Sequence, residues 1–424
     1  MVRVFAGIKR KAFDILGLDR MGERYQKLAQ NYIFLVFYTT LESVFVNTLL
    51  YKISPSMTGV VIYRAITYVA AAITMHLAAY ICQKKSPLVV IRLGGMFYLL
   101  MYVALFFGLN YMDKLNYFVA FLAGTGGAFY WTAHNILVSH YTTKNNRDIG
   151  ISALGVIQGI ITLFCPVISG FVIARMPGDI GYRIMFGVGM LCVVAQIRVQ
   201  LKLTPVEQTI HKSQLRLAIK LLLGKLTYKM LMAYEFVRGI RDGTFAFIVN
   251  MLLFEIITDE SLVGINTFLT GIMAIIGSWV YGRLVRRHNR GQYLIVVTTL
   301  LLGVCSLLFL KMNAPMVMLF NVINSFLQLF IINSCNNTTF DVLGENNSTR
   351  KSMGEMLAIR EGAMAAGRIC GLAIMMALPQ NATGYVTAMC LLTASQYIVA
   401  FIMWRVQRTL QRKEQASVPV GGTL

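Results

Sequence analysis

The feature that most constrains this chain is a series of long stretches without a charged side chain. Asp, Glu, Lys and Arg are missing from Leu93–Met112, Ile149–Ala174, Ser261–Gly282, Gly291–Leu310 and Met312–Phe340. A helix of about 20 apolar residues crosses the hydrocarbon core of a bilayer. Charged residues make up only 13% of the chain, whereas a soluble globular domain carries about 25%. The sequence therefore predicts an all-α integral membrane protein.

The alternation of apolar and basic segments predicts twelve membrane spans. Their approximate limits are 30–52, 57–82, 88–110, 115–140, 149–175, 182–200, 229–256, 261–282, 291–310, 315–340, 354–377 and 382–405. Of the 39 Lys and Arg residues, the predicted outside segments hold only Lys52, Lys114, Arg175, Arg183 and Lys311. Because cytoplasmic loops carry an excess of Lys and Arg, both termini are predicted to lie in the cytoplasm. We expect a multi-pass protein of the cell membrane.

A basic segment at 201–228 separates two groups of six spans. Its Lys and Arg residues alternate with Leu and Ile, which favours an amphipathic helix at the inner membrane surface, with a site for a calmodulin-like partner as the alternative. The predicted organisation is a cytoplasmic basic amphipathic segment at 1–29, six-helix halves at 30–200 and 229–405 on either side of this linker, and a cytoplasmic tail at 406–424.

Short matches between the two halves indicate an internal repeat. Asn47–Ile53 aligns with Asn250–Ile256, and Gln158-Gly159 aligns with Glu361-Gly362. Both matches have a separation of 203 residues. A third match, Ser56–Gly59 with Ser261–Gly264, has a separation of 205, and this nearly constant separation predicts two pseudo-symmetric halves related by duplication.

Three short motifs lie inside the spans or at their ends. They are Gly282–Arg290 after the eighth span, Gly155, Gly159, Pro166 and Gly170 in the fifth, and Gly181-Tyr182-Arg183 with Phe186 in the sixth. In these motifs the chain resembles the major facilitator superfamily, over about residues 30–405. The resemblance implies a monomeric twelve-helix secondary transporter that works by alternating access between two six-helix halves.

Two of the motifs carry further implications from the same resemblance. The loop after the eighth span resembles the family's Gly-x-Leu-x-Asp-Arg-x-Gly-Arg-Arg motif, although Arg286 stands at the acidic position. The resemblance assigns cytoplasmic gating to Gly282, Arg283, Arg286, Arg287 and Arg290. The pattern in the fifth span resembles that of exporters, and its glycines would permit close approach of helices.

Ionisable residues inside spans are costly and are candidates for the transport pathway. Glu42 lies near the middle of the first span, and Arg64 lies in the second. We interpret Glu42 either as a proton or cation site or as the structural partner of a basic residue such as Arg64.

The seventh span contains four charged residues, Glu235, Arg238, Arg241 and Asp242. Glu235, Arg238 and Asp242 have the spacing of one helix face. One interpretation is two structural ion pairs, Glu235 with Arg238 and Arg241 with Asp242. The interpretation that we favour is a set lining the transport pathway, in which Arg241 or Arg238 binds an anionic group of the substrate.

The eleventh span adds two candidates, Glu361 and Arg368, which also share a helix face. Gly367 and Gly371 flank Arg368 at the spacing of a helix-packing motif, so close contact with another helix is the structural alternative. The tenth span carries several Asn and Gln residues, among them Asn324 and Asn336, which predict a hydrated or hydrogen-bonded face.

Two uncharged polar residues complete the candidates for the pathway. His134 in the fourth span has a side chain able to titrate near neutral pH, although a single His in a helix is more often structural. Gln158 in the fifth span is a candidate substrate ligand, or a hydrogen-bond partner of a neighbouring helix.

The sequence excludes several other classes of function. It contains no Walker loop, no HExxH motif and no nucleophile elbow, so we expect no catalytic residues, cofactor or metal. The net charge of +21 is explained by cytoplasmic loops, so no nucleic-acid partner is expected. The expected partners are a small-molecule substrate, protons or another coupling ion, and the lipid bilayer.

These observations favour proton-coupled efflux of an amphipathic or partly anionic small molecule. Uptake of an organic anion or nutrient is one alternative, and a flippase for lipids or lipid-linked sugars is another. An integral membrane enzyme or a receptor is a different class, which would need clustered His and Asp at a membrane face that the sequence lacks.

Overall fold

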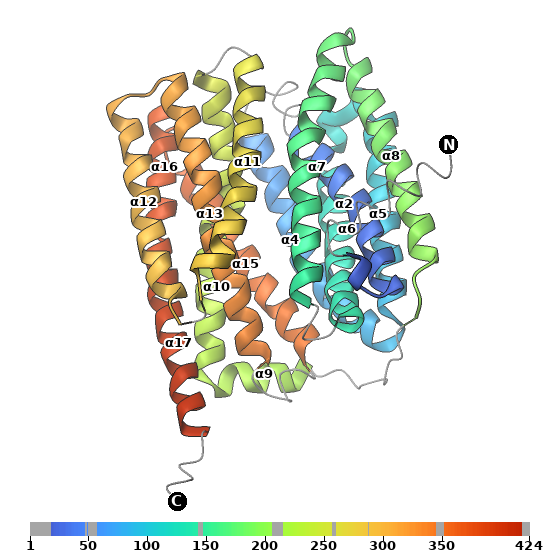
Figure 1. Ribbon diagram of the computed structural model, residues 1–424. Helices are drawn as coiled ribbons and strands as arrows, with labels where there is room; N and C mark the ends of the chain where they lie inside the picture. Colours follow the sequence, from blue (N-terminus) through green and yellow to red (C-terminus); the bar gives the residue numbers. More distant parts are fainter. Residues whose placement is uncertain are drawn as a thin grey trace, which may run out of the picture. The chain divides into compact units, whose positions relative to one another are not determined.

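The computed structural model describes residues 18–46, 49, 57–142, 147–205, 215–256, 260–286, 288–344 and 352–417. Every regular element in these ranges is helical (Figure 1). Residues 1–17 of the predicted N-terminal segment, Arg287 of the predicted gating loop and residues 418–424 of the tail lie outside the described ranges.

The described helices follow the predicted order of spans. The first half contains η1 (Leu18–Arg20), α2 (Glu23–Leu41), η2 (Glu42–Val46), α4 (Met57–Lys84), α5 (Pro87–Phe107), η3 (Leu109–Tyr111), α6 (Met112–Tyr141), α7 (Arg147–Arg175) and α8 (Ile180–Leu201). The second contains α9 (Leu215–Gly224), α10 (Leu226–Ile256), α11 (Glu260–Leu284), α12 (Arg290–Leu310), α13 (Ala314–Gly344), α15 (Met353–Met376), α16 (Ala382–Ala394) and α17 (Gln396–Ser417).

Several boundaries differ from the prediction. The first long helix begins at Glu23, earlier than predicted, because its first turns carry charged residues that a search for apolar runs leaves out. The last predicted span is divided at Ser395, whose hydroxyl donates to the carbonyl oxygen of Leu392 at 2.7 Å. Such a local bond competes with regular helix hydrogen bonding. The second piece, α17, continues to Ser417.

Eight of the described helices are long and apolar enough to cross a membrane by length and composition alone. The four predicted spans that do not meet this test are α2, α6, α10 and α15. These helices, with the short η2 that continues α2, contain most of the candidate residues, including Glu42, His134, Glu235 and Glu361. The charged and polar candidate residues are therefore concentrated in α2 with η2, α6, α10 and α15.

Contacts divide the chain into two compact units, Met1–Ser213 and Gln214–Leu424. In the first unit, α2 packs on α7 and α8, α4 packs on α6, and α5 packs on α6 and α8. In the second unit, α10 packs on α15 and α17, α11 packs on α13, and α12 packs on α13, α16 and α17. The order of packing is the same in both units, so the predicted pseudo-symmetry of two halves is confirmed.

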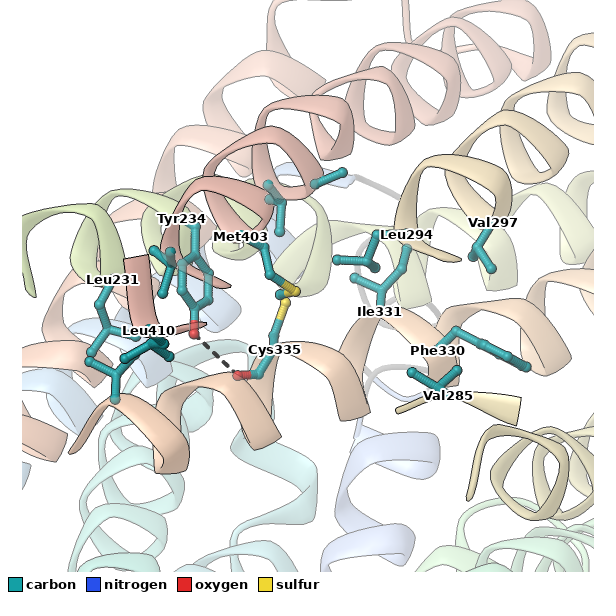
Figure 2. Close-up of a cluster of buried hydrophobic side chains, with 14 of the residues drawn as sticks. Leu231, Tyr234, Val285, Leu294, Val297, Phe330, Ile331, Cys335, Met403 and Leu410 are labelled. Carbon is teal, nitrogen blue, oxygen red and sulfur yellow. Dashed lines mark hydrogen bonds between the residues drawn. The ribbon is translucent and has the colours of Figure 1, made fainter. Parts of the chain in front are cut away.

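A large apolar core lies within the second unit (Figure 2). Tyr234 on α10 is fully buried there, and its hydroxyl donates to the carbonyl oxygen of Cys335 on α13 at 3.2 Å. Leu231, Ile331 and Met403 belong to the same core and come from α10, α13 and α17. This core holds together the helices that carry most of the charged candidates.

Helix α9 lies in the predicted basic linker and runs crosswise to α10 in Figure 1. Ala218 is buried, whereas the basic side chains of Arg216 and Lys220 are exposed. The apolar side chains of Ile219 and Leu223 are also exposed. This combination is typical of a helix at the boundary between headgroups and hydrocarbon.

Candidate functional site

The closest helix contact in the second unit is made by glycines of α10 and α15. A Cβ atom at Gly367 would collide with the carbonyl oxygen of Phe236, and one at Gly371 with that of Ile240. A Cβ atom at Gly239 would in turn collide with the carbonyl oxygen of Met364. The predicted close contact at Gly367 and Gly371 is therefore confirmed, and its partner is α10.

Glu235 lies next to this contact and is completely buried. Its Oε1 atom accepts hydrogen bonds from Nε of Arg360 at 2.7 Å and from Oγ1 of Thr339 at 2.7 Å. Its Oε2 atom lies 3.4 Å from Nη1 of Arg238. Because a buried carboxylate is costly unless it is paired and hydrogen-bonded, these contacts from α10, α13 and α15 allow Glu235 to stay charged.

The contacts continue on both sides of Glu235. Nε of Arg238 lies 2.9 Å from Oδ2 of Asp242, and Nη1 of Arg360 lies 3.2 Å from Oε1 of Glu361. Oδ1 of Asn336 accepts from Nη1 of Arg238 at 2.9 Å and from Nη2 of Arg360 at 3.2 Å. We call Asp242, Arg238, Glu235, Arg360 and Glu361 the charge network. Acids and arginines alternate along it.

The charge network contains three carboxylates and two guanidinium groups, so its formal charge is negative when all five groups are ionised. The two outer carboxylates, Asp242 and Glu361, keep 17% and 21% of their side-chain surface exposed. The central one, Glu235, is inaccessible. Asp242 and Glu361 are therefore the solvent-accessible carboxylates of the network.

Arg241 does not pair with Asp242, and the predicted Arg241–Asp242 ion pair is wrong. The carboxylate of Asp242 pairs with Arg238, one turn earlier on α10. Arg241 is 2% exposed, donates from Nη2 to Oδ1 of Asn324 at 2.7 Å, and lies with Cζ 3.9 Å from the ring centre of Phe245. Its Nε has no acceptor, and no described carboxylate lies within 4.0 Å of it. A buried guanidinium without a counter-ion is costly.

Arg368 on α15 lies at the glycine contact. Its Cβ and Cγ atoms pack against Gly243 of α10, and its Nη2 lies 3.7 Å from the sulfur of Met364. The aliphatic part of this side chain thus forms part of the α10–α15 interface, which supports the structural interpretation of the residues around Gly367.

Glu42 begins the π-helical turn η2 in the first unit. Its Oε1 accepts a hydrogen bond from the hydroxyl of Tyr63 at 2.9 Å and lies 3.9 Å from Nη1 of Arg64. Nη2 of Arg64 also lies 3.5 Å from the carbonyl oxygen of Ser43. The predicted partner of Glu42 is therefore present at a long distance. Single π-helical turns inside α-helices frequently occur at functional sites.

His134 on α6 lies inside a group of aromatic rings. Its ring stacks on Tyr32 of α2 and on Tyr130, with centroid distances of 5.3 and 5.4 Å. Nδ1 lies 3.4 Å from the hydroxyl of Tyr130, which accepts from Nδ2 of Asn31 at 3.0 Å. This buried setting supports the structural interpretation of His134. Gln158 on α7 accepts a hydrogen bond at Oε1 from Tyr32 at 2.8 Å.

The loop after α11 is held by contacts different from those of the family motif. Nη1 of Arg290 lies 2.8 Å from Oδ2 of Asp341 at the end of α13. The backbone N–H of Arg286 donates to Oδ1 of Asn289 at 2.7 Å. Arg283 covers the ring of Trp279, with Cζ 3.7 Å from its centre, and Gly282 is exposed in the last turn of α11. Asp341 is thus the described acid that pairs with this loop, through Arg290.

Reasoning from the sequence missed Arg360 and Thr339 as parts of the site. Arg360 is adjacent to Glu361, and a basic residue beside an intramembrane acid was the available signal. Thr339 carries no charge and its role depends on the packing of α13 against α10. The polar face of the tenth span is confirmed, because Asn324 and Asn336 accept hydrogen bonds from arginines of α10.

The architecture and these polar helices define a membrane protein with the major facilitator fold. The structure of the E. coli fucose:proton symporter FucP is similar, with a TM-score of 0.65, 12% identity, and coverage of 90% of this chain and 98% of that one. The nucleoside transporter NupG is similar, with a TM-score of 0.65, 12% identity, and coverage of 91% and 99%. No protein-family profile matches the chain.

Curated sequences similar to this chain come from bacilli. The uncharacterized protein YqgE of Bacillus subtilis (strain 168) is 22% identical over 333 residues, which are 78% of this chain and 76% of that protein. An uncharacterized protein encoded in the sodM 3′ region of Geobacillus stearothermophilus is 24% identical over 147 residues, which are 35% of this chain and 69% of that protein.

Proposed function

We propose that this chain is a secondary active transporter that couples the movement of a partly anionic small molecule to protons. The observation that carries the proposal is the charge network, in which three carboxylates share two guanidinium groups on α10 and α15, two of the spans predicted from the sequence. Ionisable groups at such depth mark ion and proton pathways in membrane proteins. The sequence has no phosphate-binding loop, so the expected driving force is an ion gradient or the gradient of the substrate itself.

Two carboxylates are proposed as proton carriers, Asp242 and Glu42. Asp242 is partly exposed and, among the described residues, forms an ion pair with Arg238, so its protonation would release Arg238 from one side of the network. Glu42 accepts a hydrogen bond from Tyr63 and lies 3.9 Å from Nη1 of Arg64, so a change in its charge acts directly on Arg64 of α4. The fucose:proton symporter with the same fold is named for proton coupling, which agrees with this proposal.

Arg241 is proposed to bind the anionic group of the substrate. Among the described residues, no carboxylate lies within 4.0 Å of the buried Arg241 guanidinium, whose contacts are one amide acceptor and one aromatic ring, so no described counter-charge at contact distance offsets its burial. A carboxylate or phosphate supplies that charge, and the planar fork of Arg binds it with two hydrogen bonds. Rotation of Arg241 away from Asn324 would present the fork to a ligand.

Export is proposed as the direction of transport, on the sequence pattern of α7. In the structure, apart from the local backbone of α7 itself, no described atom lies within 4 Å of a Cβ built at Gly155 or Gly170, so neither glycine makes a close contact with a described helix. The α7 pattern therefore supports the direction of transport by resemblance only. From the family resemblance we propose a monomer in the cell membrane, and from the distribution of Lys and Arg we propose that both termini lie in the cytoplasm.

Transport in proteoliposomes tests this proposal. The purified chain is reconstituted with a pH-sensitive dye inside, and carboxylate- and phosphate-bearing small molecules are added outside one at a time. We expect at least one anion to cause a change of internal pH that empty liposomes do not show. A complete lack of response, with protein that unfolds cooperatively after extraction, contradicts the proposal.

A further inference from the structure

The first unit contains an uncharged counterpart of the charge network. The internal repeat of 203 residues places Tyr32 opposite Glu235 and Gln158 opposite Glu361. In the second unit these positions are acids linked through Arg360. In the first unit they are a phenol and an amide joined by a hydrogen bond of 2.8 Å. The duplicated positions therefore have different chemistry, ionic in one unit and neutral in the other.

Aromatic rings hold this neutral pair in place. The ring of Tyr32 stacks on His134, and its centroid lies 6.0 Å from that of Trp131, edge to face. Trp131 also contacts His134 edge to face at 5.5 Å and Tyr130 at 5.9 Å. Tyr32 and Tyr130 are buried, so the rings form a rigid wall behind Trp131.

Two side chains of this group, one aromatic ring and the amide of the neutral pair, are accessible to solvent. Trp131 is 37% exposed, and Gln158 is exposed although it lies well inside α7. An exposed amide in the hydrocarbon of a bilayer is costly, which favours a position beside water or a ligand. Oε1 of Gln158 is occupied by the Tyr32 hydroxyl. Among the described residues, neither Nε2 of Gln158 nor Nε1 of Trp131 has an acceptor.

We propose that Trp131, Gln158 and Tyr32 form a subsite for an uncharged ring that carries oxygen acceptors. The indole face stacks on the ring, and the free N–H groups of Gln158 and Trp131 donate to its hydroxyl or carbonyl oxygens. Tyr32 is a positioning residue, because its hydroxyl orients the Gln158 amide so that the NH2 group points outward. This inference rests on the proposed function, because it names a class of small molecule that the first unit binds.

Two kinds of molecule share the required chemistry, a pyranose sugar and a heteroaromatic base with oxo groups. D-Galactose and uridine are suitable probes, and glycerol is the control because it has hydroxyl groups without a ring. Binding is measured on the full chain in detergent by the emission of Trp131, in a background with Trp279→Phe and Trp404→Phe. Calorimetry on the chain with all its tryptophans gives the same measurement without the background substitutions.

We expect saturable binding of galactose or of uridine, and none of glycerol. Gln158→Ala should weaken that binding about tenfold, since a hydrogen bond and the orientation of the site are lost together. Tyr32→Phe should weaken binding of the ring less than Gln158→Ala does. The Gln158 amide is still present, but it loses the hydrogen bond that orients it. Thr162→Val is the matched control, since Thr162 is exposed on the same helix and its hydroxyl bonds only to the α7 backbone.

The inference is overturned if neither ring binds to folded protein, or if Gln158→Ala binds as tightly as Thr162→Val. Its failure is distinguishable from failure of the proposed function, because binding is measured without a gradient. Proton-linked movement of an anion without ring binding leaves the proposed function in place and removes the subsite. Ring binding without any transport supports the subsite and removes the proposed function.

Discussion

The Oε1 atom of Glu235 on α10 lies 2.7 Å from Nε of Arg360 on α15, and no part of the Glu235 side chain is exposed. The two residues are 125 positions apart in the sequence. Glycines on both helices bring the backbones close enough for this contact. The packing of α10 against α15 and the placement of charge within the second unit therefore depend on each other.

Breaking this pair should destabilise the protein strongly. Glu235→Gln leaves Arg360 and Arg238 without their shared carboxylate, and loss of one partner of a buried pair costs about 3–5 kcal/mol. Thermal unfolding in detergent should show a clear fall in Tm. Glu23→Gln is the control, since Glu23 pairs with Lys27 at 2.8 Å on an exposed surface, and it should leave Tm unchanged. Equal Tm values for the two variants would show that Glu235 is not paired in this way.

The glycine contact should not tolerate a larger side chain. Gly367→Val forces a branched side chain against the backbone of Phe236, and such overpacking costs about 1–3 kcal/mol or more. The variant should lose yield and thermal stability. Gly303→Val on α12 meets open space, so it should behave like the natural chain. If both variants were equally stable, α10 and α15 would not be in close contact.

Much of the fold follows from the sequence because lipid imposes strong rules. Uncharged stretches such as Gly291–Leu310 give the spans, and the distribution of Lys and Arg gives their proposed direction. Gly367 and Gly371 indicated a close helix contact, but not its partner. The predicted helix boundaries were less accurate, for example at the start of α2, which lies at Glu23. Helices extend beyond the apolar part of a span into polar surroundings, which a search for apolar residues does not detect.

The site was less predictable than the fold. The charged residues of the seventh span were recognised as candidates, but their pairing depends on helix rotation and on neighbours far away in the sequence. Arg238 and Arg241 are only three positions apart, yet Arg238 contacts two acids and Arg241 contacts an amide and a ring. The partners Thr339 and Asn324 come from α13, whose position is set by the tertiary packing.

Two substitutions of Arg241 should show whether this residue binds the substrate or only stabilises the fold. Arg241→Lys keeps the charge but loses the planar fork, so it should weaken binding of the transported anion about tenfold with little change in Tm. Binding is measured by calorimetry beside thermal unfolding. If Arg241→Ala unfolds the protein while Arg241→Lys binds every tested anion normally, Arg241 has a structural role and the assignment to substrate is wrong.

Neutralising a proton carrier should separate driven transport from exchange. Glu42→Gln keeps an oxygen that accepts a hydrogen bond from Tyr63, but the amide cannot bind and release a proton. Asp242→Asn likewise keeps an oxygen that accepts from Arg238 and loses the titratable group. The variant at the true carrier should lose accumulation driven by a pH gradient and keep exchange of labelled for unlabelled substrate. Unimpaired accumulation in both variants would exclude both residues as carriers.

The proposed topology is testable without knowledge of the substrate. Reporter fusions near residues 145, 212 and 350 should report a cytoplasmic position, and fusions near 180 and 380 an external one, because few Lys and Arg residues lie in the external segments. Activity of an alkaline phosphatase fusion and fluorescence of a cytoplasmic reporter give opposite signals. Finding 145 and 180 on the same side would contradict the arrangement of twelve spans.

The most direct measurement is accumulation of a labelled anion in proteoliposomes under an imposed pH gradient. The proposal predicts that the anion reaches an internal concentration different from the external one, and that a protonophore abolishes this difference. The same liposomes without a gradient should only equilibrate the anion. If the anion equilibrates equally with and without the gradient, the chain does not couple transport to protons, and the role proposed for its intramembrane carboxylates is contradicted.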